Sequence, residues 1–295
     1  MSENFRTGYV AIIGRPNVGK STLTNRLVGA KVSITSRKAQ TTRHRIHGVL
    51  TTDNTQYIFV DTPGFQTTHT NALNRLMNRS VTSSFADVDV ILLVIEAGRW
   101  GAGEEALLAM LPEGKPVILV INKIDRWEDK GQLLPFITKL STEHQFAEIV
   151  PLSAEKGMGT EALLKTVATY LPVMPPVFDV DDITDRSERF LASEILREKL
   201  FRNLGEELPY GLAVEIEKFE QEGDLRRIFA AIIVDRSAHK IMVIGKSGER
   251  LKRISTDARR DMEKLFGGKV WLETWIKVKT GWADDERALK SLGYE

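Results

Sequence analysis

The chain has 295 residues, 42% of them hydrophobic, and a formal net charge of +1 at pH 7. That length and apolar content suffice for two globular domains with cores of their own. The sequence contains no cysteine, which excludes disulfides, thiolate metal sites and cysteine nucleophiles. It shows neither a signal-peptide pattern nor an apolar run near the ~20 residues of a membrane span. We therefore expect a soluble, cytoplasmic protein.

Residues 1–172 alternate short β-rich apolar runs with helical patterns. The predicted strands are Tyr9–Ile13, Arg45–Thr52, Gln56–Asp61, Asp89–Glu96, Pro116–Asn122 and Glu148–Leu152. The predicted helices are Lys20–Val28, Asn71–Phe85, Glu104–Leu111, Gly131–His144 and Thr160–Tyr170. Runs such as VILLVI and VILVIN are apolar on both faces, as parallel strands covered by helices are, whereas the Asp53-Asn54 turn indicates one antiparallel edge. We expect an α/β domain with a mostly parallel sheet flanked by helices.

A phosphate-binding loop follows the first predicted strand. Residues 14–21 match the pattern GxxxxGK[ST] between a strand and a helix, which is the context that the pattern requires. In such a loop the backbone amides surround a phosphate, Lys20 neutralises its oxygens, and the Ser21 hydroxyl binds Mg²⁺. The residues expected to bind the nucleotide phosphates are Gly14, Arg15, Pro16, Asn17, Val18, Gly19, Lys20, Ser21 and Thr22.

A second group of candidate residues ends the predicted strand 56–61. Asp61 can hold Mg²⁺ through a water, and the Gly64 amide can sense a γ-phosphate, with Thr62 and Pro63 between them. The pattern DxxG alone is weak, because a turn with Pro and Gly after a strand is common. Its position in the second β unit after the phosphate loop favours the nucleotide interpretation.

A third group selects the base. Asn122, Lys123 and Asp125 follow the strand PVILVIN, and Asp125 can accept hydrogen bonds from guanine N1–H and the 2-amino group. Adenine offers neither donor, so the buried carboxylate would stay unpaired and adenine would be rejected. Ser153 and Ala154 follow the next strand, and we expect them to complete the pocket with the Ala154 amide facing guanine O6.

These residues resemble the motifs of the translation-factor-related GTPases, in the same order. The resemblance implies GTP and GDP as ligands, hydrolysis of GTP, and a Mg²⁺-binding threonine in the first switch. Within Gln40–Arg43, Thr42 is the better match for that threonine and Thr41 is the alternative. The expected metal ligands are thus Ser21, Thr42 and Asp61. The residues expected to act in catalysis are Asn17, Lys20, Thr42 and Gly64.

Residue 65 bears on the mechanism. Ras-like relatives carry a glutamine there to orient the attacking water, and the ring of Phe65 cannot do so. Unassisted hydrolysis should therefore be slow and depend on backbone groups, bound cations or a partner. Asn17 occupies the position at which related GTPases hold K⁺ against the phosphates. A local hydrogen-bonding role for Asn17 in the loop is an equally good interpretation.

The sequence pattern changes after a proline-rich linker, which we expect at residues 173–185. Beyond it, strands are predicted at Gly211–Phe219, Arg227–Asp235, Lys240–Ile244 and Val270–Val278, and helices at Ser187–Leu204 and Glu249–Phe266 before a last short helix. Residues 181–235 carry 8 basic and 14 acidic side chains, whereas residues 236–280 carry 12 basic and 5 acidic ones. We expect a separate α+β domain at 186–295 with a basic, phosphate-facing surface.

The basic segment contains a GxxG sequence at Gly245–Gly248, followed by an amphipathic helix. This arrangement resembles a KH domain, whose GxxG loop clamps the backbone of about four nucleotides of single strand. Glycine permits close approach of a phosphate, and the basic side chains supply charge. The residues expected to contact RNA are Gly245, Lys246, Ser247, Gly248, Arg250 and Arg253.

Three tryptophans lie near the C-terminus. Trp271 and Trp275 share one face of a predicted strand, and Trp282 follows it. Base stacking is one interpretation, but two large rings on one strand face favour packing in the core.

With GRPNVGKS, QTTRHR and VIGKSG in one chain, the sequence resembles the Era family of bacterial ribosome-assembly GTPases over its whole length. The resemblance implies binding of small-subunit (16S) ribosomal RNA near its 3′ end, a role in maturation of the 30S subunit, and some association with the membrane surface.

Other functions fit less well. A signalling GTPase whose second domain binds protein would not need the GxxG sequence or the basic segment. A nucleotide kinase or ATPase would lack the Asn122–Asp125 motif. A relative with two GTPase domains is excluded because the chain has one phosphate loop.

Overall fold

The computed structural model describes residues 4–36, 38, 41–65, 72–83, 85, 87–127, 129–205 and 208–294. The chain divides into two compact units. The N-terminal unit comprises Met1–Ser33, Thr42–Thr68 and Met77–Asp185, and the C-terminal unit comprises Ile34–Thr41, His69–Leu76 and Arg186–Glu295.

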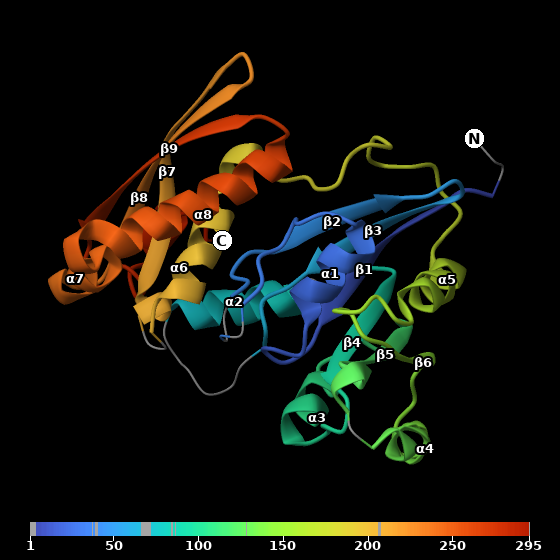
Figure 1. Cartoon of the computed structure of the whole chain (residues 1–295). Coiled ribbons are helices and arrows are strands. Elements are labelled where there is room, and N and C mark those ends of the chain that lie inside the picture. The colour runs from blue at the N-terminus through green and yellow to red at the C-terminus, as the bar shows by residue number, and fades with distance from the viewer. Residues whose placement is uncertain are drawn as a thin grey trace. The chain divides into compact units, whose positions relative to one another are not determined.

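The N-terminal unit is built on a six-stranded sheet of order β2-β3-β1-β4-β5-β6 (Figure 1). Its strands are β1 (Arg6–Ile13), β2 (Ile46–Thr51), β3 (Thr55–Asp61), β4 (Val90–Glu96), β5 (Val117–Asn122) and β6 (Glu148–Pro151). Its helices are α1 (Lys20–Val28), α3 (Ala102–Leu108), α4 (Leu133–Glu143) and α5 (Thr160–Tyr170), and α2 (Ala72–Ser83) begins among the residues of the C-terminal unit. Only β2 runs antiparallel to its neighbour among these strands, so the predicted α/β sheet with one antiparallel edge is confirmed.

Helices cover both faces of this sheet. Val10 and Ile12 of β1 belong to a core that includes apolar side chains of α1 and α5. Ala11 and Ile13 point to the other face and share a core with residues of α3 and α4. Because parallel strands end at the same edge, the segments after β1, β3, β5 and β6 are brought together there.

Residues 173–185 pair with the N-terminal unit along their length. Val173 bridges Arg6, and Thr184 bridges Gly48. The Val49 amide donates to the Ile183 carbonyl at 2.9 Å. The segment expected as a linker is therefore hydrogen-bonded to the sheet that precedes it.

The C-terminal unit has a three-stranded sheet of order β7-β8-β9 with helices on one face (Figure 1). Its elements are α6 (Glu188–Asn203), β7 (Leu212–Glu222), β8 (Leu225–Val234), α7 (Ser237–Ile244), α8 (Glu249–Phe266), β9 (Lys269–Val278) and α9 (Glu286–Ser291). Strands β7 and β8 are antiparallel, and β8 and β9 are parallel. Apolar side chains of α6 and α8 form one core with this sheet.

The strand prediction for Lys240–Ile244 is wrong, because these residues form the end of α7. Of its apolar residues Val243 is buried, whereas Ile241 and Met242 are 73% and 51% exposed. An apolar run of this length cannot be assigned to strand or helix by periodicity alone. None of the helices within the described ranges has both the length and the apolar character to span a bilayer.

The prediction that Trp271 packs in the core is also wrong, because its side chain is 60% exposed. Its neighbours Val270 and Leu272 point toward the helices, so Trp271 lies on the opposite face of the sheet. Trp282 is fully buried, and its Nε1–H donates to the Gly211 carbonyl at 3.2 Å.

We predict that Trp282→Ala lowers the free energy of unfolding of the C-terminal unit by about 3–5 kcal/mol, because it removes a buried ring and leaves a cavity. Trp271→Ala is the matched control and should change that free energy by no more than about 0.5 kcal/mol. Urea unfolding followed by circular dichroism measures both. Equal losses in the two variants would contradict the burial assigned to Trp282.

Candidate functional site

The phosphate loop connects β1 to α1 through backbone conformations that few residues adopt. Gly14 and Gly19 have φ values of 153° and 102°, and Asn17 has a φ of 66°. A Cβ at Gly14 would lie 2.3 Å from the Val94 carbonyl oxygen, so a side chain there would displace the loop. Gly19 precedes α1 and has no side chain to cap its first amides, which leaves them for an anionic ligand.

Lys20 lies across this loop. Its Nζ donates to the Gly14 and Arg15 carbonyls at 3.1 and 3.0 Å, and the side chain is buried. Burial lowers the pKa of Lys20 to about 8, against the effect of the nearby Asp61 carboxylate. A phosphate bound here would place negative charge beside the buried ammonium group and stabilise its charged form.

Asp61 ends β3 and is fully buried beside Lys20. Burial raises its pKa, while the hydrogen bond from Ser33 and the charge of Lys20 oppose the shift. Its Oδ2 accepts from Ser33 Oγ at 2.5 Å, and within the described structure its Oδ1 has no hydrogen-bond partner. A buried carboxylate oxygen in this situation fits a nearby cation or its bound water.

The candidate metal ligands Ser21 and Thr42 are adjacent, with 2.8 Å between their hydroxyl oxygens. Thr41, the alternative to Thr42, instead donates its hydroxyl to the Lys38 carbonyl at 2.7 Å. The geometry thus favours Thr42. Together with Asp61 the two hydroxyls form an oxygen-rich donor set of the kind that Mg²⁺ prefers.

The loop after β3 closes onto the phosphate loop. A Cβ at Gly64 would lie 2.9 Å from Pro16 backbone atoms, so glycine is needed for this approach. The Thr62 hydroxyl donates to the Ile12 carbonyl at 2.9 Å, which ties the loop to β1. Phe65 is partly buried and packs against the core on one face of the sheet, consistent with a ring that does not orient water.

Asn122 ends β5 and connects three loops. Its Nδ2 donates to the Val18 carbonyl at 2.8 Å, and its Oδ1 accepts from the Lys123 and Ala154 amides at 2.8 and 3.0 Å. Ser153 is fully buried beside Ala154. The prediction that the Ala154 amide faces guanine O6 differs from this arrangement, because Asn122 takes that hydrogen bond here.

Asp125 lies in a short 3-10 turn after Lys123. Its Oδ1 is buried and has no hydrogen-bond partner among the described residues. Burying such an atom costs free energy unless a ligand supplies a donor. Lys123, with a φ of 64°, donates from Nζ to the Asn17 carbonyl at 2.6 Å and to Glu96 at 2.7 Å, which joins the base loop to the phosphate loop.

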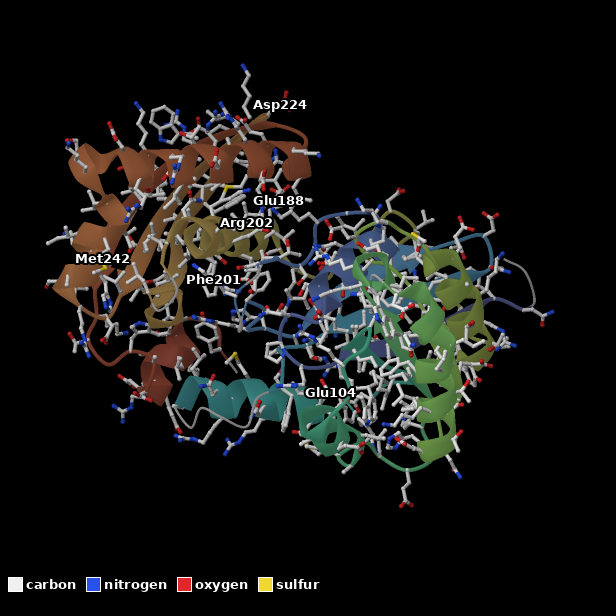
Figure 2. All side chains as sticks on the ribbon, turned by 60° about the horizontal axis from the view of Figure 1, so that its bottom comes forward. Glu104, Glu188, Phe201, Arg202, Asp224 and Met242 are labelled. Atoms are coloured by element: carbon white, nitrogen blue, oxygen red, sulfur yellow. The ribbon has the colours of Figure 1, made fainter. Side chains whose placement is uncertain are left out.

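The C-terminal unit holds a groove of about 370 Å³ that begins at the last glycine of the GxxG sequence. Gly245, Ser247 and Gly248 have φ values of 73°, 52° and 82°, so the loop turns sharply between α7 and α8. Lys246 and Ser247 are exposed. Figure 2 labels Met242 on α7, just before this loop.

The groove lies between α8 and the edge strand β9. The residues that line it are Gly248, Leu251, Lys252, Ser255, Thr256, Arg259, Leu272 and Thr274. Only Gly248 was among the predicted RNA contacts. The Arg250 guanidinium donates to the Met242 carbonyl, and Arg253 is exposed on α8 outside the lining.

Sequence reasoning missed several of these residues for identifiable reasons. Lys252 and Arg259 lie one turn and three turns into α8, on the face toward β9, and helical spacing from Gly248 would have indicated them. The Ser255 and Thr274 hydroxyls are 2.9 Å apart across the groove, which no local pattern predicts. Ser33, the partner of Asp61, likewise comes from a loop without a motif.

Comparison with protein families identifies both units. The family described as 50S ribosome-binding GTPase matches residues 9–123, and the KH domain family matches residues 207–283. GTPase Era of Nitrosomonas eutropha is 59% identical over 294 residues, covering 100% of this chain and 99% of the relative. GTPase Era of Chromobacterium violaceum is 54% identical, covering 99% and 98%.

Comparison with solved structures gives the same result as comparison with the sequence relatives. The chain is similar to an Aquifex aeolicus Era variant bound to GDP·AlF4⁻, with a TM-score of 0.95 and 42% identity over 98% of this chain and 99% of that one. It is equally similar to an Era protein in complex with MgGDPNP and nucleotides 1506–1542 of 16S ribosomal RNA, with the same TM-score, identity and coverage.

We predict that Asp125→Asn weakens GDP binding about a hundredfold or more, since each hydrogen bond to a charged group contributes about 1.5–3 kcal/mol. The amide can donate to the carbonyl of xanthine, so XDP should bind the variant more tightly than the native protein. Isothermal titration calorimetry measures both ligands, and ADP should show no binding to the native protein.

The control for this substitution is Asp129→Asn, which removes the same charge from an exposed side chain nearby. It should leave GDP affinity unchanged. Comparable affinities of the native protein for ADP and GDP would contradict the base assignment.

Proposed function

Because the chain belongs to the Era family of GTPases, we propose that it is a GTP-driven switch that binds the 3′ end of 16S ribosomal RNA and assists maturation of the small ribosomal subunit. The observation that carries the proposal is the presence, in one chain, of Asp125, whose Oδ1 is buried without a hydrogen-bond partner among the described residues, and of a GxxG loop that opens a groove. The relative bound to MgGDPNP and 16S RNA supports the choice of both ligands.

The residues of the candidate nucleotide site have different roles in GTP hydrolysis. Ser21, Thr42 and Asp61 would hold Mg²⁺, which would offset the negative charge of the phosphates. Lys20 and the first amides of α1 stabilise negative charge on the phosphates. Gly64, held against Pro16, lets a backbone amide come close to a γ-phosphate.

K⁺ is the cation that we propose to assist the reaction. Phe65 cannot orient water, so additional positive charge near the phosphates would stabilise the transition state. Asn17 is anchored through its backbone carbonyl, which accepts from Lys123, and this anchoring does not require its side chain. The carboxamide of Asn17 is therefore available as a cation ligand at the rim of the loop.

We predict that replacing Na⁺ by K⁺ at constant ionic strength raises the rate of GTP hydrolysis severalfold. Asn17→Ala should remove the difference between the salts while GDP still binds. A phosphate-release assay at saturating GTP provides the measurement. Equal native rates in the two salts would exclude a K⁺ role and leave Asn17 as a loop residue.

In the C-terminal unit, single-stranded RNA would enter the groove between α8 and β9 with its backbone against the GxxG loop. Lys252 and Arg259 line the groove and supply positive charge. The paired hydroxyls of Ser255 and Thr274 present donors and acceptors for a base edge. This arrangement supports recognition of bases as well as of phosphates.

We predict that Lys246→Asp with Ser247→Asp weakens binding of a single-stranded RNA from the 16S 3′ end at least about tenfold, because two carboxylates replace groups that face phosphates. GTP hydrolysis without RNA should continue. The matched control is Lys290→Asp with Ser291→Asp, the same two residue types on α9, outside the groove.

Fluorescence anisotropy at one fixed salt concentration measures the RNA affinity of both double variants. Equal losses in the two would mean that charge alone, and not the GxxG loop, accounts for binding. A cytoplasmic location with part of the protein at the membrane surface stays a prediction from the family resemblance, and sedimentation with anionic vesicles tests it.

A further inference from the structure

The loop between β6 and α5 carries Ser153 and Ala154 of the candidate base site. Its own backbone closes it into a turn, because the Ser153 amide donates to the Met158 carbonyl at 2.9 Å and the Gly157 amide donates to the Ser153 carbonyl at 2.8 Å. Neither of these bonds uses the carbonyls of Ala154 and Glu155. What binds those two carbonyls therefore decides how firmly the middle of the loop is held.

The side chain of Arg26, in the last turn of α1, binds both carbonyls. Its Nε donates to the Ala154 carbonyl at 3.1 Å, and its Nη2 donates to the Glu155 carbonyl at 2.7 Å. A Cβ added at Gly157 would lie 3.8 Å from the Arg26 guanidinium, so the side chain lies close against the turn. One planar group thus holds two successive peptide units of the base loop.

A basic residue in the last turn of a helix commonly stabilises that helix, because it offsets the negative end of the helix dipole. The two hydrogen bonds of Arg26 run instead to a loop that lies 128 and 129 residues further along the chain. An ammonium group could offset the dipole equally well, but it lacks the fixed planar donors of a guanidinium. The geometry of these bonds thus points to a role in holding the loop.

Ala154 is bound at both its amide and its carbonyl. The amide donates to Asn122 Oδ1 at 3.0 Å, and the carbonyl accepts from Arg26. Ala154 itself is 1% exposed, whereas Arg26 is exposed. Asn122 therefore fixes Ala154 from the interior of the site, and Arg26 fixes it from the surface.

Helix α1 connects this contact to the phosphate loop. The helix begins with Lys20 and Ser21, and Arg26 follows about 9 Å further along the axis. A single helix thus bears phosphate-binding groups at one end and the support of the base loop near the other. The separation of the phosphate loop and the base loop therefore depends on α1 as well as on the sheet.

We propose that Arg26 is a positioning residue for guanine nucleotides, which holds Ala154 and Glu155 so that the base loop stays closed and nucleotide release is slow. The inference rests on the proposed function and deepens it, because it assigns control of release to a residue outside the GTPase motifs. GDP and GTP carry the same base, so both should depend on Arg26 equally. Hydrolysis takes place at the phosphates and should not depend on it.

The experiment compares full-length Arg26→Met and Arg26→Lys with the native protein. Both substituted residues are good helix formers, so α1 is preserved. Stopped-flow displacement of fluorescent GDP and of a fluorescent non-hydrolysable GTP analogue gives the two dissociation rate constants. Single-turnover assays at saturating GTP give the rate of hydrolysis.

We expect Arg26→Met to raise both dissociation rate constants about tenfold, the order expected when hydrogen bonds from a charged donor are lost. The single-turnover rate should change by less than about twofold, because the substitution acts on binding and not on the chemical step. Arg26→Lys keeps the charge but not the planar pair of donors, so its release rates should lie between those of Arg26→Met and the native protein.

Lys139→Met is the control for loss of a positive charge from the same unit. Lys139 is 64% exposed and pairs with Glu143 at 3.8 Å within α4. Its substitution should leave both dissociation rate constants at native values. Equal acceleration in Lys139→Met and Arg26→Met would overturn the proposal, since net charge and not the contact with the loop would then account for release.

The proposal is also overturned if Arg26→Met or Arg26→Lys releases both nucleotides at native rates, since the paired hydrogen bonds would then not be needed. Faster release of the GTP analogue alone, or an equal fall in the single-turnover rate, would overturn it by placing the effect at the phosphates. Urea unfolding without nucleotide measures stability, and a loss that matches the change in release would overturn it too. Failure of the proposed function looks different, because the native protein itself would then not bind guanine nucleotides.

Discussion

The side-chain carboxamide of Asn122 links the three loops that form the candidate nucleotide site. It binds the phosphate loop through Val18, the base loop through Lys123 and the last loop through Ala154. Each loop starts from a different strand, and without this group each would move with its own strand end. The side chain is almost fully buried, so these hydrogen bonds form away from water, where they are strong. Loss of Asn122 would therefore disturb phosphate and base recognition together.

The grouping of the candidate nucleotide-site residues could be predicted largely from sequence because each motif is local. Each motif follows a strand directly, and a parallel sheet brings strand ends together without further information. The partners of those motifs could not be predicted in the same way. Ser33 binds Asp61, and Lys123 binds Glu96, through spacings set by the tertiary fold. The choice between Thr41 and Thr42 likewise required the position of Ser21.

The C-terminal unit was harder to predict from sequence, because several of its side chains lie in environments that are unusual for their residue types. Helix α6 buries charged side chains, with Glu194 bound to Arg197 by two hydrogen bonds of 2.7 and 2.6 Å. A sequence pattern assigns such residues to solvent, since unpaired charges are costly to bury. Conversely, Trp271 is exposed where a large ring was expected to be buried, because it lies on the face of the sheet opposite α6 and α8.

Because residues 173–185 pair with the first sheet, very few residues of unpaired chain connect the two units. Asp185 Oδ2 lies 2.9 Å from His47 Nδ1, and Ser187 already caps α6. Only Arg186 lies between Asp185 and Ser187. The free connection between the units is therefore one or two residues long, at roughly 3.5 Å per residue. A connecting segment this short keeps the local concentration of one unit around the other high, whatever the concentration of the protein in solution. RNA captured by one unit is thereby presented to the other as part of the same molecule.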